Sequence, residues 1–168
     1  MVERGADPTA QSEDYGDALY DAADHGDLIQ VRQLLERGAD PNKQGVFYGN
    51  ALEAAAQHSE SLEIVKLLLE HGADPNKQGG SFGNALQAAA YSGSLEIVKL
   101  LLKRGADPNK QRGGDFGNAL QAAAYGGSLE IVKLLLERGA DPNKQGGYYG
   151  ISHRSSVWWF SGDSEVVA

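Results

Sequence analysis

One motif of about 33 residues recurs along this chain of 168 residues, and its periodicity constrains the fold more than any other feature. Gly-Ala-Asp-Pro occurs five times, and its aspartates are separated by 33, 34, 33 and 34 residues. Leu-Glu-Ile-Val-Lys-Leu-Leu-Leu occurs three times, as does Gly-Asn-Ala-Leu. A period between about 20 and 50 residues predicts a stack of similar units, because each unit buries its apolar face only against its neighbours.

Each unit is predicted to contain two short helices and an extended loop. The first helix follows an asparagine, which is a good N-cap residue, and runs through three alanines. The second helix of the third unit has a wide apolar stripe at positions 95, 97, 98, 100, 101 and 102. Gly105 ends that helix, and Asp107-Pro108-Asn109 favours a turn after it. We therefore expect Leu100 to be buried in the stack, and the one-residue slips near His58 and Arg112 to lie in loops.

This pattern resembles the ankyrin repeat from about Gly5 to Gly150, which is most of the chain. It is also similar to the near-identical ankyrin arrays of multidomain proteins from filamentous fungi. The resemblance implies an all-α solenoid of stacked helix–turn–helix units with β-turn fingers. The repeats would span about 5–38, 39–72, 73–105 and 106–139, with the start of a fifth at 140–150.

One element of the family pattern is missing. The usual Thr-Pro-Leu-His is replaced by Asn-Ala-Leu-Glu or Asn-Ala-Leu-Gln. Asn50, Asn84 and Asn118 must then provide the helix caps that threonine provides elsewhere.

The first repeat has the features of an N-terminal cap. Gln30 and Gln33 occupy positions that are isoleucine and leucine in the later repeats, for example Ile64 and Leu67. These positions are three residues apart on one helical face, which an internal repeat needs apolar and an end repeat needs polar. The residues from Gly5 to Pro8 still match a repeat junction, so an eroded unit or a linker before the array stays open.

Residues 151–168 form a degenerate tail that departs from the repeat. If one nucleotide is dropped from a suitable codon spelling of residues 154–168, the shifted frame encodes the fifteen residues of 122–136. Whatever codons are chosen, Trp158-Trp159-Phe160 forces two glycines in that frame. We therefore interpret the tail as an out-of-frame repeat. The alternative is an evolved aromatic motif at Trp158 and Trp159.

The negative charge is concentrated at the N-terminal end. Residues 1–40 contain ten acidic and three basic side chains, a local net charge of −7, against −8 for the whole chain. An acidic surface repels phosphate backbones, so we expect no nucleic acid as a partner. The acidic end is either a solvated cap that keeps the array soluble or an acidic docking face.

No residue pattern in the chain is typical of catalysis. The absence of cysteine excludes disulfides, thiolate metal sites and a cysteine nucleophile, and it is compatible with a cytoplasmic protein. The four histidines show no metal-ligand spacing, and the glycine-rich stretch 113–117 lacks the Lys-Ser/Thr of a phosphate loop. No apolar segment is long enough to span a membrane. We expect no enzyme, no cofactor, no metal and no membrane association.

The resemblance implies that the fingers and first helices line one concave side of the stack, where a protein partner docks. Finger residues Lys43, Lys77, Lys110 and Lys144 would form a ladder there. An aromatic row would lie just before the first helices, at Tyr15, Tyr48, Phe82, Phe116 and Tyr149. Tyr91 and Tyr125 end first helices on adjacent repeats, about 8–10 Å apart if they follow the spacing of packed helices.

Aromatic residues beside cations are common in the energetically important part of protein interfaces. The rings of the row have an alternative role, which is to pack each finger against its neighbour. Phe47 and Arg112 are among the few positions at which the similar units differ. The candidate partner-binding residues are Phe47, Tyr48, Phe82, Tyr91, Arg112, Phe116, Tyr125 and Tyr149.

Three functions are compatible with the sequence. The chain is a module that binds a protein partner, a structural spacer from a truncated array without a specific partner, or a regulatory subunit that covers the active site of an enzyme. End-to-end self-association through the C-terminal tail is a further expectation, because the fourth repeat presents an unmodified internal face.

Overall fold

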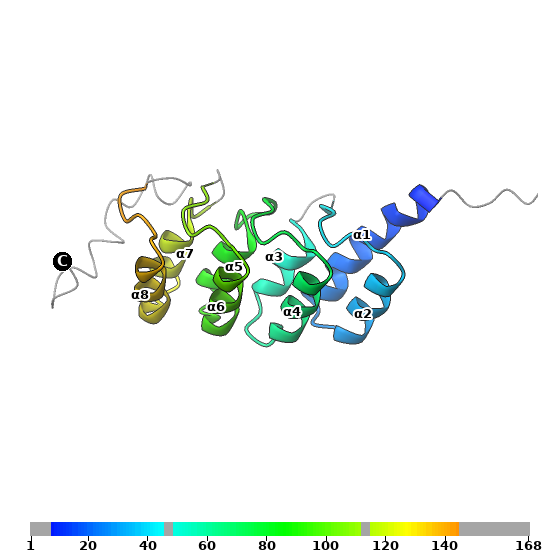
Figure 1. The fold of residues 1–168 in the computed structure, drawn as a ribbon, viewed down its shortest axis with the longest axis horizontal. Coiled ribbons are helices and arrows are strands. Elements are labelled where there is room, and N and C mark those ends of the chain that lie inside the picture. The colour runs from blue at the N-terminus through cyan, green and yellow to red at the C-terminus, as the bar shows by residue number, and fades with distance from the viewer. Residues whose placement is uncertain (1–7, 46–48, 112–114, 145–168) are drawn as a thin grey trace, which may run out of the picture.

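The computed structural model describes residues 8–45, 49–111 and 115–144, with side chains described from Tyr15 onward. Within these residues the chain forms successive helix pairs side by side along the long axis, with the connecting loops along one edge (Figure 1). The helices are α1 (Pro8–Asp24), α2 (Leu28–Glu36), α3 (Ala51–Ala56), α4 (Leu62–Glu70), α5 (Ala85–Tyr91), α6 (Leu95–Lys103), α7 (Ala119–Tyr125) and α8 (Leu129–Glu137). The described part has isolated bridges but no strand, so the predicted all-α solenoid is confirmed. The start of a fifth repeat from Gln145 onward and the tail lie outside the described residues.

The first helices begin where the sequence places their caps. The side chain of Asn50 accepts a hydrogen bond from the Glu53 amide at 3.0 Å. Asn84 and Asn118 accept equivalent bonds at 2.9 Å from the amides three residues later. Each asparagine satisfies an amide that the helix itself leaves without a partner, so the predicted capping role is confirmed.

The second helices end at glycine, also as predicted. Gly105 follows α6 with φ at +89°, a left-handed conformation that glycine adopts at little cost. The extra residue near His58 lies in the turn between α3 and α4, as expected. The slip near Arg112 lies outside the described residues.

Helix α1 differs from the prediction. It runs from Pro8 to Asp24, so Tyr15 lies inside a helix and not in a finger before one. The stretch between Pro8 and Tyr15 contains neither glycine nor a further proline, and nothing in it interrupts a helix. Proline is also favoured in the first helical turn, because the missing amide hydrogen is not needed there. From Pro8 onward, the residues of the first repeat that would correspond to a finger are therefore helical.

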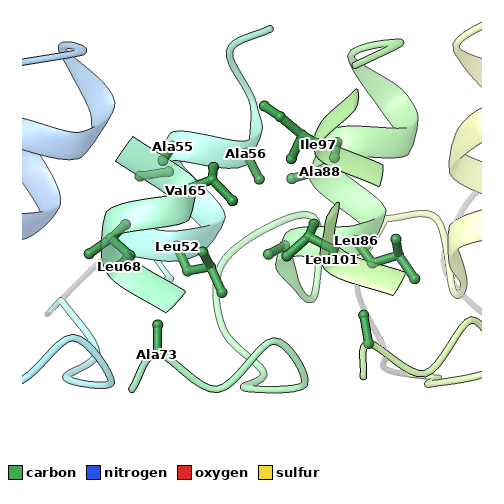
Figure 2. Close-up of a cluster of buried hydrophobic side chains, with 14 of the residues drawn as sticks. Leu52, Ala55, Ala56, Val65, Leu68, Ala73, Leu86, Ala88, Ile97 and Leu101 are labelled. Carbon is green, nitrogen blue, oxygen red and sulfur yellow. The ribbon is translucent and has the colours of Figure 1, made fainter. Parts of the chain in front are cut away.

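The core forms one apolar cluster through all four repeats. In the middle of the array, Leu52, Val65 and Leu68 of one repeat and Leu86 and Leu101 of the next are buried (Figure 2). The alanines of α3 and α5 are also buried, so neighbouring first helices approach closely. Small side chains at these positions let the repeats stack without gaps.

The polar positions of α2 lie on an exposed face, which is what the prediction of an N-terminal cap requires of them. Gln30 and Gln33 are exposed, whereas Ile64 and Leu67 at the equivalent positions of α4 are buried. One expectation is wrong in degree: Leu100 is only half-buried, whereas its neighbour Leu101 is fully buried, as are Ile97 and Val98 of the same helix. In a helix, side chains one residue apart point about 100° away from each other, and in α6 this places Leu101 in the core and Leu100 at its margin.

Asparagines of the fingers link successive repeats. The side chain of Asn76 donates to the Gly105 carbonyl at 2.9 Å and accepts from the Asp107 amide at 2.8 Å. Asn42 and Asn109 make the same pair of bonds to the repeats that follow them. The Asp-Pro-Asn motif thus connects neighbouring repeats as well as forming a turn.

Candidate protein-binding surface

Four aromatic residues from the fingers and first helices of the third and fourth repeats form one cluster, called here the aromatic strip. The Tyr91 ring contacts both finger rings, with centroid distances of 5.3 Å to Phe82 and 4.9 Å to Phe116, and the two finger rings are themselves stacked at 5.9 Å. Phe116 in turn lies 5.3 Å from Tyr125. These separations are within the range of favourable aromatic pairs. The strip consists of Phe82, Tyr91, Phe116 and Tyr125.

Phe82 and Phe116 of the predicted row and the pair of tyrosines at the helix ends therefore form one cluster. The Tyr91 and Tyr125 rings are stacked at 6.0 Å, closer than the axes of packed helices. The sequence does not show this because the finger rings come to lie against the helix ends only after the loops have folded.

The four rings of the strip differ in their exposure to solvent. Phe116 is only 6% exposed and belongs to the core, whereas Tyr91 is 38% and Tyr125 is 51% exposed. Phe82 is half-buried. The phenylalanine rings therefore pack against the tyrosine rings, and the tyrosines are the more exposed members of the strip.

The strip is restricted to the C-terminal half of the array. Tyr91 and Tyr125 correspond to Asp24 and Gln57 in the first two repeats. The Asp24 carboxylate lies 3.3 Å from Nε2 of His58, so this position is polar and hydrogen-bonded in the N-terminal half. At this position of the first helix, the residue thus changes from aspartate and glutamine to tyrosine along the stack.

Half of the predicted binding residues can be placed. The four that form the strip come together, although they were predicted from two separate patterns. The other four lie outside the described residues: Phe47, Tyr48, Arg112 and Tyr149.

A small pocket lies beside the strip and was not predicted. It has a volume of about 80 Å³, and the residues that line it are Tyr20, Gly49, Glu53, Gln57, Gly80, Ser81 and Phe82. Phe82 belongs to both the pocket and the strip. One sequence signal pointed here: Glu53 is a glutamate where the otherwise similar third and fourth repeats have Gln87 and Gln121.

The described part of the chain offers no alternative centre with metal-binding chemistry. Among residues 8–45, 49–111 and 115–144, no three histidine, aspartate or glutamate side chains are grouped so as to hold an ion. None of the helices described is both long and apolar enough to cross a bilayer.

Comparison with known proteins agrees with the geometry. A family model described as ankyrin repeats, in three copies, matches residues 1–79, 19–112 and 52–146. These overlapping matches together extend from residue 1 to residue 146. A search of curated proteins found no match.

Proposed function

This chain belongs to the ankyrin-repeat family, and from that premise we propose that it is a non-catalytic module that binds a protein partner. Ankyrin repeats are generally protein–protein interaction modules, and the family is typically non-enzymatic. The binding surface in this proposal is the aromatic strip with the finger residues around it. A chain without cysteine suits a reducing compartment, so we place this interaction in the cytoplasm.

The observation that carries the proposal is the exposure of Tyr91 and Tyr125 on a buried aromatic support. Burying an aromatic side chain contributes about 1.5–3 kcal/mol. Tyr91 and Tyr125 are 38% and 51% exposed, so a partner that covers the two rings gains much of this free energy. Their mutual stacking limits rotamer freedom before binding, which lowers the entropy cost of association. Rigid aromatic anchors of this kind dominate the binding energy of many interfaces.

The test is a pull-down that compares three forms of the full chain. We expect the wild type and the control variant Ile29→Ala to recover one partner in stoichiometric amount. Ile29 is a large apolar side chain, 71% exposed, on the second helix of the first repeat and outside the strip. The double variant Tyr91→Ala/Tyr125→Ala should lose that partner, with an affinity at least about tenfold weaker.

Melting temperatures separate binding from folding. If the double variant unfolds much more readily but keeps its affinity per folded molecule, the two rings are core residues and the site lies elsewhere. Equal recovery by all three forms would contradict the proposed surface. A partner enzyme whose activity falls on binding would identify the chain as a regulatory subunit, and failure to recover any stoichiometric partner would favour a structural spacer.

A further inference from the structure

The glycine that follows Tyr125 lies directly against the backbone of Tyr91. Gly126 caps α7, and Tyr91 is the last residue of α5, so the two meet where these neighbouring first helices end. We propose that Gly126 is a positioning residue, which holds Tyr91 and Tyr125 together as one stacked pair for the partner. This inference rests on the proposed function and explains how the two rings are brought together.

The backbone conformation of Gly126 does not itself require glycine. Its φ is −71° and its ψ is −5°, which is a right-handed helical conformation that other residues adopt readily. Gly127 differs, because its φ of +73° lies in the left-handed region that favours glycine. A substitution at Gly126 therefore tests the contact with the neighbouring helix and adds no strain to its own backbone.

The end of α5 leaves no room for a side chain on Gly126. A Cβ atom added there would lie 2.3 Å from the carbonyl oxygen of Tyr91 and 3.1 Å from its carbonyl carbon, whereas Cβ contacts in proteins are almost never shorter than 3.0 Å. Both contacts are with backbone atoms, so a change of side-chain rotamer cannot relieve them. The ends of α5 and α7 would have to move apart.

The junction between α3 and α5 has a side chain at the equivalent position. Ser92 follows Tyr91 as Gly126 follows Tyr125, and its hydroxyl lies 3.3 Å from the carbonyl oxygen of Ala56 on the preceding first helix. The second repeat has Gln57 where the third has Tyr91, so this junction does not bring two tyrosines together. Among the described first helices, glycine follows the last residue only at the junction where two tyrosines are stacked.

The stacked pair tolerates little movement of the two helices. The ring centroids of Tyr91 and Tyr125 are 6.0 Å apart, and favourable aromatic pairs have separations of about 4.5–7 Å. A further displacement of about 1 Å would bring the pair to the outer limit of this range. The rings would then have more rotamer freedom, and their ordering would cost more conformational entropy on binding. Gly126 therefore acts on binding through the two tyrosines.

The first experiment needs no partner and uses NMR of the full chain labelled in its tyrosine rings. We expect NOE contacts between the ring protons of Tyr91 and Tyr125 in the wild type and their loss in Gly126→Ser. Gly126→Ala adds the Cβ atom without a hydroxyl and should have the same effect. The matched control Ser92→Gly exchanges the same two residue types at the preceding junction and should keep the contacts, because it adds no atom.

The second experiment is a double-mutant cycle with the partner that the wild type recovers in the pull-down. Gly126→Ser should weaken binding about tenfold per folded molecule. In the background Tyr91→Ala/Tyr125→Ala, the same substitution should leave the remaining affinity unchanged, because a positioning residue has no effect once the rings that it positions are absent. Failure to recover a partner would contradict the proposed function, and the ring contacts would still decide the role of Gly126.

Three results would overturn the inference. The first is ring contacts that persist in both Gly126 variants. The second is an equal loss of affinity with and without the two rings, which would mean that Gly126 contacts the partner itself. The third is unfolding of the fourth repeat in both variants, because the junction would then not adjust in the way proposed.

Discussion

At the scale of single residues, the finger asparagines have the most testable role. Asn76 makes two hydrogen bonds to the following repeat, one as donor and one as acceptor. A hydrogen bond in a folded protein contributes about 0.5–1.5 kcal/mol net. We therefore expect Asn76→Ala to lower the free energy of unfolding by about 1–2 kcal/mol, measured by urea denaturation.

The matched variant is Asn76→Asp, which keeps the acceptor oxygen for the Asp107 amide and loses the donor to Gly105. Its loss of stability should be intermediate. If the alanine variant is as stable as the wild type, the asparagines form the local turn only and do not link the repeats.

At the scale of one element, helix α6 separates core from surface within two adjacent residues. Leu101 is fully buried, and its replacement by alanine should cost about 2–5 kcal/mol, because it removes packed apolar atoms and leaves a cavity. Leu100 is half-buried, so the same replacement should cost about 1–2 kcal/mol. Chemical denaturation of the two variants gives the comparison directly.

The order of the two values is the decisive result. Both variants remove the same atoms from the same helix, so differences in helix propensity cancel. An equal or reversed cost would mean that α6 is rotated about its axis from the orientation described here.

At the scale of the whole molecule, the C-terminal end of the stack is less covered than the interior. Leu129 is 43% exposed, whereas the equivalent Leu62 and Leu95 are half-buried. Ala124 is half-buried, whereas Ala90 is fully buried. We expect the apolar cluster at 157–160 of the tail to cover this end or to join two chains through it, since exposed apolar surface favours association. Removal of residues 151–168 should then lower the melting temperature or increase aggregation.

Tryptophan fluorescence of the chain can test this expectation about the tail. Trp158 and Trp159 are its only tryptophans, so intrinsic tryptophan fluorescence reports on the tail alone. Blue-shifted emission at every concentration indicates a tail that covers its own array, and a shift that grows with concentration indicates end-to-end dimers. Emission typical of water, together with a truncated form as stable and monomeric as the full chain, would contradict both.

The repeat made most of the fold predictable from sequence. Helix positions, asparagine caps and glycine ends depend on interactions between residues that are close together in the sequence, so the sequence alone predicts them. The polar face of α2 was predictable for the same reason, because Gln30 and Gln33 break an otherwise apolar period. Comparison among the near-identical units showed where the sequence of one unit departs from the others, as it does at these two glutamines.

The tertiary structure decided the features that depend on contacts between repeats. Which of Leu100 and Leu101 enters the core depends on the rotation of α6 against its neighbours, and an apolar stripe this wide does not specify it. The aromatic strip and the pocket beside Glu53 exist because loops about 34 residues apart fold back over neighbouring helices. Periodicity determines the helices and turns of each unit, whereas side-chain packing between units decides which of its residues stay exposed and can contact a partner.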